Sequence, residues 1–145
     1  MKKSFFIILT ILLIIVAVIS FYIYNVQRIN NIATKHNEQY TSYYDKEILG
    51  TDLISLINKV IDYNEKNNIE KQENSIYYIN NHSNSIQITI KFIESDKVIN
   101  MEDIAEKQTE SFIKFFATST FKCTDIKYHT QTKNVQSMHF EQVEN

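Results

Sequence analysis

Four histidines are the side chains in this sequence best suited to hold a metal ion. A structural zinc site takes four ligands and a catalytic one takes three. The sequence has no H-x-x-H or C-x-x-C pair, and the one pair that we expect to form, Asp125 with His139, supplies too few ligands. We therefore predict neither a metal nor a cofactor. The four histidines are His36, His82, His129 and His139.

Nucleophiles and paired acids give no stronger signal for catalysis. Cys123 is the only cysteine, and its place in a predicted strand favours a small buried side chain over a thiolate activated by a base. Gly50 is the only glycine, which excludes the glycine-rich loops that bind phosphates and dinucleotides. We therefore expect that this protein is not an enzyme. The neighbouring acids lie at predicted loops or helix starts: Asp45 with Glu47, Glu94 with Asp96, and Glu102 with Asp103.

The N-terminal segment is the most informative part of the chain. Residues 4–27 contain no charged side chain, and nearly all of residues 5–24 are apolar. About 20 apolar residues, at about 1.5 Å of helix rise each, span the roughly 30 Å hydrocarbon core of a bilayer. Lys2 and Lys3 precede the segment, and cytoplasmic flanks retain positive charge. We therefore expect a cytoplasmic N-terminus and an extracytoplasmic body.

A cleaved signal peptide is the alternative interpretation of this segment. Such peptides have an apolar stretch of roughly 7–15 residues that ends at a small-residue cleavage site. Here the apolar stretch is longer, and more apolar sequence follows the best cleavage candidate, which ends at Ser20. Tyr22 and Tyr24 suit the aromatic residues of a membrane interface. We predict an uncleaved anchor that crosses the cell membrane once.

The rest of the chain is mildly acidic. Beyond Lys2 and Lys3 it has 13 basic and 17 acidic residues, a net charge of −4, and no basic stripe, so we expect no nucleic-acid partner. A single cysteine allows no internal disulfide. The expected segments are a cytoplasmic start at 1–3, a transmembrane anchor at 4–24, a helical stalk at 25–45 and an extracytoplasmic domain at 46–145.

An apolar pattern continues beyond the membrane segment and predicts one helix from about Ser4 to about Asp45. Its members recur at alternating steps of four and three, which is typical of a helix face that packs on another element. This face contacts either partner helices or the chain's own domain. We name it the stalk stripe: Tyr22, Val26, Ile29, Ala33, His36, Tyr40 and Tyr43. The predicted partner interface comprises Val26, Ile29, Ala33, Tyr40, Tyr43 and Tyr44.

The first half of the domain is predicted to hold a helix and a hairpin. Thr51 and Asp52 offer a capping side chain ahead of an apolar-periodic helix that ends near Tyr63. A short strand at 75–80 and a strictly alternating strand at 85–93 should pair antiparallel. Residues 94–100 would then link this hairpin to the next helix.

The second half is predicted to repeat this order of elements. A helix from about Met101 to Thr118 should precede strands at 121–129 and 135–142. Pairing Ile126 with Met138 and Thr124 with Phe140 puts apolar residues on one face, and a phase change predicts a bulge near Thr124. The fold class is therefore α+β, with an N-terminal transmembrane helix and stalk and two helices on an antiparallel four-stranded sheet.

The layout of a membrane helix that continues into a domain with an antiparallel sheet resembles type IV pilins and pseudopilins. The sequence lacks their processing motif, because no glycine or glutamate precedes Glu38. Residues 43–68, with 121–129 and 138–142, are similar to a group of short, uncharacterised, single-pass bacterial proteins. The first resemblance implies a subunit of a cell-envelope assembly, and the second implies no activity.

These observations predict a membrane-anchored extracytoplasmic protein that acts through protein contacts. Its expected partners are the lipid bilayer, other membrane or envelope proteins, and further copies of itself through the anchor and stalk. Tyrosines in the first half of the domain could anchor such a partner. The alternative is a single-pass ligand-binding or sensory module. Those tyrosines are Tyr40, Tyr43, Tyr44, Tyr63, Tyr77 and Tyr78.

Overall fold

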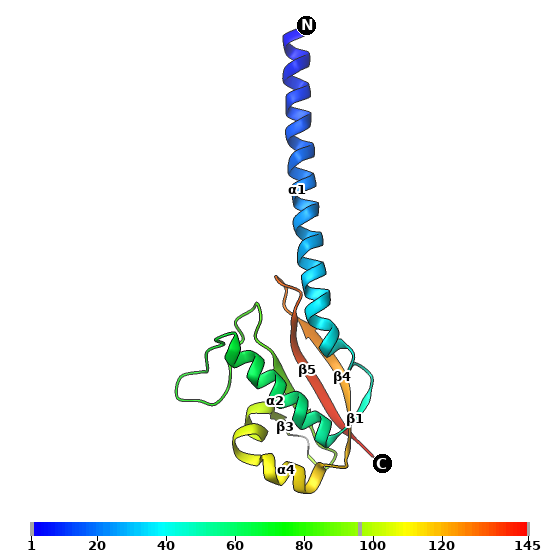
Figure 1. Cartoon of the computed structure of the whole chain (residues 1–145), viewed down its shortest axis with the longest axis vertical. Coiled ribbons are helices and arrows are strands. Elements are labelled where there is room, and N and C mark those ends of the chain that lie inside the picture. The colour runs from blue at the N-terminus through cyan, green and yellow to red at the C-terminus, as the bar shows by residue number, and fades with distance from the viewer. Residues whose placement is uncertain (1, 96, 145) are drawn as a thin grey trace.

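The computed structural model describes residues 2–95 and 97–144 and shows one long helix joined at its end to an α+β domain (Figure 1). Helix α1, Lys2–Thr41, stands clear of the domain for most of its length. Neither proline nor glycine occurs before Gly50, so nothing in the sequence interrupts it. The long N-terminal helix is thus confirmed.

Helix α1 ends earlier than predicted, at Thr41 instead of Asp45. The Tyr43 N–H bonds to the Tyr40 carbonyl at 3.1 Å, which closes a turn. Asp45 then adopts a left-handed φ of 59°, and its N–H donates to the Cys123 carbonyl at 3.0 Å. The chain therefore leaves the helix in order to join the sheet.

The sheet has five strands in the order β1-β4-β5-β2-β3 and is mixed, so the predicted four-stranded antiparallel sheet is wrong. Strands β4 and β5 form its longest antiparallel pair, and β5 also pairs parallel with β2. The strands are β1 Glu47–Leu49, β2 Gln87–Lys91, β3 Val98–Asn100, β4 Thr120–Tyr128 and β5 Val135–Val143.

The predicted first hairpin is wrong in its pairing. The alternation in β2 is correct, since Ile88 and Ile90 are fully buried, but Ile88 pairs with Met138 of β5. Residues 75–80 form no strand, because the Tyr78 N–H donates to the Glu102 carboxylate at 3.1 Å instead of to a sheet ladder. Part of the predicted link at 94–100 is strand β3, which pairs antiparallel with β2.

The second hairpin is confirmed, including its bulge. Ile126 pairs with Met138, and the register shifts between Cys123 and Asp125, which is where an extra residue was expected. The predicted pairing of Thr124 with Phe140 is wrong, because Cys123 takes that position. Asp125 lies opposite His139, as predicted.

The connector before the second helix contains an unpredicted strand, β1, which pairs with the start of β4. Helix α2, Gly50–Lys66, then starts without a side-chain cap, so the prediction that Thr51 or Asp52 caps it is wrong. The Gly50 N–H bonds to the Ser119 carbonyl at 2.9 Å instead. A Cβ on Gly50 would lie 1.9 Å from the Phe116 carbonyl oxygen, so only glycine fits this contact.

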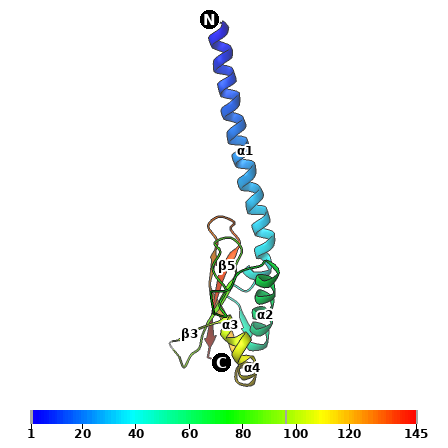
Figure 2. The ribbon, with the colours of Figure 1, turned by 90° about the vertical axis from the view of Figure 1, so that its left-hand side faces the viewer.

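The helices that follow β1 cover one face of the sheet (Figure 2). The predicted helix at 101–118 is divided into three parts, and the hydroxyl of Thr109 bonds to the carbonyl of Ile104, five residues back, at 2.8 Å. This bond fits the wider turn of the π-helix. The parts are α3 Met101–Asp103, the π-helical segment η1 Ile104–Gln108, and α4 Thr109–Phe116.

The core lies between these helices and the sheet. Leu53, Ile57 and Val60 of α2 are fully buried on the strands. At the end furthest from α1, aromatic rings replace the aliphatic side chains. Their centroids lie 4.7–6.5 Å apart, within the usual range of edge and offset contacts. The rings belong to Phe92, Phe112, Phe116 and Phe121.

Candidate functional site

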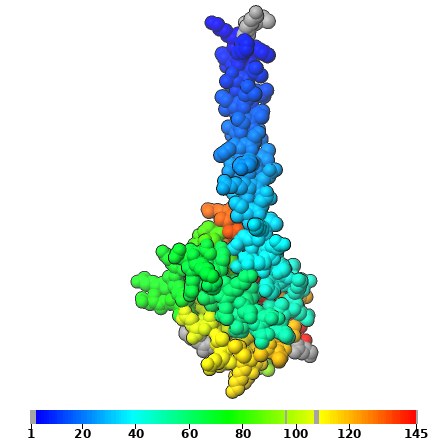
Figure 3. Space-filling model, in the orientation of Figure 1, coloured from blue at the N-terminus to red at the C-terminus, as the bar shows by residue number. Residues whose placement is uncertain are grey.

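The first part of α1 presents apolar side chains to its surroundings on every side. An 18-residue window within residues 3–41 has a mean hydropathy of 3.1, and none of it is buried by the chain (Figure 3). Phe6 is 63% exposed and Phe21 is 71% exposed. This segment is long enough and apolar enough to cross a membrane.

The stalk stripe divides into two halves where α1 meets the domain. Ala33 and Tyr40 are buried by the chain's own domain, with 2% and 1% of their surface exposed. Val26 and Ile29, on the same face but nearer the N-terminus of α1, are exposed. Of the remaining predicted interface residues, Tyr43 is half-buried and Tyr44 is 57% exposed.

Asn37 joins α1 to the domain through both ends of its side chain. Its Nδ2 donates to the Lys133 carbonyl at 2.7 Å, and its Oδ1 accepts the Val135 N–H at 2.8 Å. Only 8% of the residue is exposed. Because both partners lie where the β4–β5 turn enters β5, this amide fixes the helix against the hairpin.

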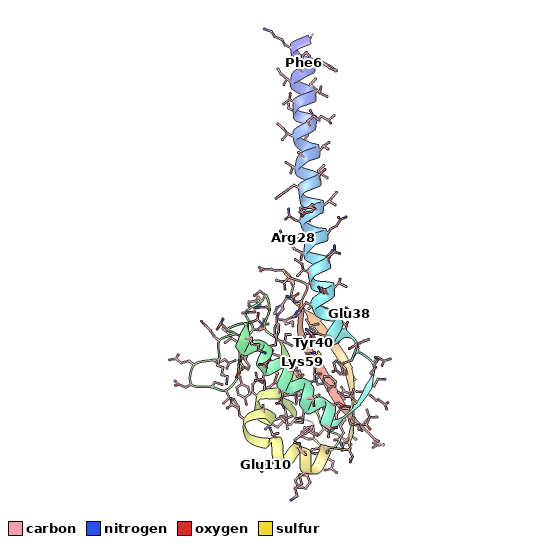
Figure 4. All side chains as sticks on the ribbon, viewed as in Figure 1. Phe6, Arg28, Glu38, Tyr40, Lys59 and Glu110 are labelled. Atoms are coloured by element: carbon pink, nitrogen blue, oxygen red, sulfur yellow. The ribbon has the colours of Figure 1, made fainter. Side chains whose placement is uncertain are left out.

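An aromatic cluster completes the junction. The His36 ring lies 5.6 Å from Tyr40 and 5.1 Å from Tyr63 of α2, and Lys59 lies over Tyr40 at 5.6 Å (Figure 4). Burial lowers the pKa of His36, and it raises the pKa of Tyr40 to about 12. Within the described part of the chain, Nε2 of His36 is buried without a hydrogen-bond partner. The junction therefore favours uncharged rings.

Further hydrogen bonds bring a third segment to the same end of the domain. The Thr132 hydroxyl donates to the Ser83 carbonyl, and Nε2 of His129 lies 2.8 Å from the Ser85 carbonyl oxygen. Residues 29–37 of α1, 83–85 and 129–135, far apart in sequence, thus lie together at one end of the domain. We name these three segments the proximal end of the domain.

A small groove lies between α1 and the β4–β5 turn at the proximal end. Its volume is about 210 Å³, and its lining comes from both elements. Oδ1 of Asn134 is buried and has no partner among the described residues. The lining residues are Ile29, Ile32, Gln131, Thr132 and Asn134.

A larger cleft opens at the opposite end, which we name the distal cleft. Its volume is about 340 Å³, and aromatic side chains dominate it. Phe115, at its rim, is 67% exposed. The lining residues are Phe92, Glu94, Ser95, Ile99, Ser111, Phe112, Phe115 and Phe116. Large exposed apolar side chains around a cleft are typical of a binding surface.

The region around Tyr77 and Tyr78 holds a polar pocket of about 180 Å³ with a buried acid in its wall. Glu102 is only 4% exposed and accepts the Tyr78 N–H, and burial raises the pKa of its carboxyl. The Tyr77 hydroxyl donates to Asp103 at 2.7 Å, and the Tyr78 hydroxyl donates to Glu65 at 3.3 Å. These contacts occupy both tyrosine hydroxyls.

The histidines and Cys123 lie at separate places in the fold. His36 is at the junction, His82 is in an exposed loop, and His139 bonds to Thr89 at 2.8 Å on the sheet. Across residues 2–95 and 97–144, no three side chains of the His, Cys, Asp or Glu type form a group that could hold a metal. Cys123 is fully buried, and burial raises the pKa of its thiol to about 11.

The acids named in the sequence analysis also lie at different places in the fold. Asp45 pairs with Lys122 at 2.7 Å, and Glu94 lines the distal cleft. Asp96 lies outside the described residues. The burial of Glu102 was not predicted, since an acid at a helix start is ordinarily solvated and no pattern in the chain signals its burial. The distal cleft was not predicted either.

Searches against known protein families, curated proteins and solved structures gave no match to this chain. The geometry of these surfaces is therefore the basis of the functional argument.

Proposed function

We propose that this protein is anchored in the cell membrane by α1 and holds its domain outside the cytoplasm to bind another envelope protein. The observation that carries the proposal is the continuity of α1. Its exposed apolar part runs without a break into a part that Ala33, Asn37 and Tyr40 fix to the domain. A domain attached in this way keeps a set orientation to the membrane.

The orientation of the anchor follows from its flanking charges. Lys2 and Lys3 favour a cytoplasmic N-terminus. We propose that the anchor is not cleaved and crosses the bilayer once, with the domain on the extracytoplasmic side. This arrangement turns the distal cleft away from the membrane, towards other proteins.

The distal cleft is the surface that we propose for the protein partner. Phe115 is exposed at its rim, and Phe92 and Phe112 lie within it. Aromatic side chains in clefts supply much of the affinity of protein interfaces. We propose a partner that inserts an apolar side chain here, and a non-enzymatic role for this chain as a structural or interaction subunit with a pilin-like layout.

Site-specific photo-cross-linking in intact cells tests this surface. A photoreactive residue at Ser111, which lines the cleft, should give a defined band heavier than the 17.2 kDa chain. The same residue at exposed Glu110, next to it on α4, is the matched control and should give none. Phe115→Asp should abolish the Ser111 band. Equal bands from both positions, or a band that survives Phe115→Asp, would contradict the proposal.

The mass of the cross-linked band identifies the kind of partner. A ladder at multiples of 17.2 kDa would show self-assembly, whereas a single other mass would show a distinct envelope protein. In either case the Phe115→Asp variant must remove the band.

A ligand-binding or sensory role is the second candidate, and the buried carboxyl of Glu102 in the wall of the polar pocket favours it. A buried acid beside an opening suits a ligand that donates hydrogen bonds. A small-molecule donor that raises the unfolding temperature of the full chain, but not of a Glu102→Ala variant, would support this role.

A further inference from the structure

The polar pocket is built where four parts of the fold meet around one buried acid. The loop between α2 and β2, the strands β2 and β3, and the start of α3 all contribute to its wall. Its volume of about 180 Å³ suits a small molecule or one end of a longer one. None of the described residues that line it carries a positive charge. The lining residues are Gln72, Tyr77, Tyr78, Gln87, Asn100 and Glu102.

The carboxylate of Glu102 lacks a counter-charge. The residue is only 4% exposed, and its Oε1 accepts the Tyr78 N–H, a neutral donor, at 3.1 Å. Lys71 pairs with Glu106 at 2.9 Å instead. Among residues 2–95 and 97–144, no lysine, arginine or histidine forms an ion pair with Glu102. A buried carboxylate without a counter-ion is costly, so a cation in the pocket would offset part of that cost.

Other acids make the surroundings of the pocket negative. The two tyrosine hydroxyls donate to Asp103 and Glu65. Lys71 lies 5.2 Å from the centre of the Tyr78 ring and bonds to Glu106. Together with the buried acid, this part of the described structure holds four carboxylates and one ammonium group. A field of this sign attracts cations and repels anions.

The other lining groups suit the hydrogens of an ammonium ion. Nε2 of Gln87 donates to the Tyr78 carbonyl at 3.3 Å, which leaves Oε1 of the same side chain as an acceptor. An ammonium group has three N–H donors and no acceptor, so it suits a wall of carboxylate and carboxamide oxygens. Tyrosine rings attract the same cation through their faces, as the position of Lys71 over Tyr78 illustrates.

We propose that the polar pocket binds a small organic molecule that carries a primary ammonium group. The ammonium donates to the Glu102 carboxylate and to Oε1 of Gln87, and the carbon atoms next to it contact the tyrosine rings. Within the described residues no group of acids and histidines is large enough to hold a metal, which favours an organic cation. This inference rests on the ligand-binding role proposed above as the second candidate, and it names the charge and donor group of the ligand.

The test measures the unfolding temperature of the detergent-solubilised full chain with ethylammonium chloride. We expect a saturable rise in Tm of about 5 °C at ten times the Kd. Tetramethylammonium chloride carries the same charge without an N–H donor, and sodium chloride matches the ionic strength. Neither salt should raise Tm in a saturable way. An equal rise with tetramethylammonium or sodium would overturn the proposed site.

Two variants with matched controls identify the residues responsible. Glu102→Gln keeps an acceptor for the Tyr78 N–H but removes the charge, so it should abolish the rise in Tm. Asp103→Asn changes the neighbouring acid, which does not line the pocket, and should keep the rise. Asn100→Lys, at an exposed position in the lining, supplies the chain's own ammonium and should also abolish the rise, whereas Asn100→Gln should keep it. Equal responses within either pair would overturn the proposal.

A neutral donor separates this inference from the ligand-binding role itself. If acetamide gave the same rise in Tm as ethylammonium, and Glu102→Gln removed both, the pocket would bind a ligand but the need for a cation would be overturned. If neither compound raised Tm, the ligand class would be overturned together with the evidence for a sensory role. The partner cross-link at Ser111 depends on neither result, because Ser111 lines the distal cleft.

Discussion

The two ends of the domain are built from different interactions. At the proximal end, the side chain of Asn37 and the hydroxyl of Thr132 pair with backbone groups of other segments. At the distal end, phenylalanine rings pack on one another, and Phe115 remains exposed. Directional hydrogen bonds fix one geometry, whereas apolar surface can adapt to a partner. The proximal end therefore fixes the position of the domain relative to α1, whereas the distal end leaves apolar surface free to contact a partner.

The largest effect on stability should come from removing the amide of Asn37. Asn37→Ala leaves the buried N–H of Val135 and the carbonyl of Lys133 without their partner, which should cost about 3 kcal/mol of unfolding free energy. Chemical denaturation of the detergent-solubilised full chain measures this. Asn30→Ala, an exposed asparagine on the same helix, should change stability by less than about 0.5 kcal/mol. If both variants lost a similar amount of unfolding free energy, the two hydrogen bonds of Asn37 would not be what stabilises the junction.

A somewhat smaller effect is expected where the start of α2 meets the end of α4. Gly50→Ala forces a Cβ against the Phe116 carbonyl, and overpacking of this kind should cost about 2 kcal/mol. Exposed Thr51→Ala is the control, with less than about 0.5 kcal/mol expected from the same denaturation measurement. If Gly50→Ala were as stable as the parent, the backbone at Phe116 would be able to move aside, and the close contact with Gly50 would not be required.

The junction and the polar pocket should respond to pH in opposite directions. Burial lowers the pKa of His36 below its ordinary value of 6.5, so its contribution to stability is present above that pH and is lost on acidification. Burial raises the pKa of Glu102, so its contribution is present in acid and is lost as pH rises through the raised value.

Denaturation at about pH 8 and about pH 5 measures the change due to His36, and a further measurement at about pH 4, below the ordinary Glu pKa of 4.5, measures the change due to Glu102. His36→Gln should reduce the loss of stability in acid, while Glu102→Gln should reduce the loss at the higher pH. If His36→Gln left the loss of stability in acid unchanged, the junction would tolerate a charged His36 ring.

The smallest effect on stability should come from the rim of the distal cleft. Phe115 is already 67% exposed, so Phe115→Asp should change the unfolding free energy by less than about 0.5 kcal/mol while it removes the partner cross-link. Destabilisation of about 2 kcal/mol or more would mean that Phe115 supports the fold, and the loss of the cross-link would then say nothing about contact.

The sequence predicts which face of the sheet a side chain lies on better than it predicts which strands pair. The alternation around Ile88 and the phase change at Cys123 each follow from burial of one sheet face, and both are confirmed. A period of two does not say which strand lies beside Ile88, so the parallel pairing with β5 was missed. Strand β1 has three residues, too few to show any alternation.

The candidate surfaces were harder to predict, for a related reason. The periodicity of the stalk stripe shows that one face of α1 packs, but not that Ala33 and Tyr40 pack on the chain's own domain. Asn37 lies beside that stripe as one of many asparagines, and its partners are about a hundred residues away in sequence. Glu102 is buried through a contact with the backbone of Tyr78 that no local pattern encodes.

The most direct test of the account is the topology of the intact chain in cells. A membrane-impermeant maleimide should label Thr118→Cys in intact cells and Ser4→Cys, which keeps Lys2 and Lys3, only after the membrane is opened, with both proteins in the membrane fraction at the full 17.2 kDa. Labelling of Ser4→Cys in intact cells, or a shortened chain released from the membrane, would contradict the central claim that α1 is an uncleaved anchor holding the domain outside.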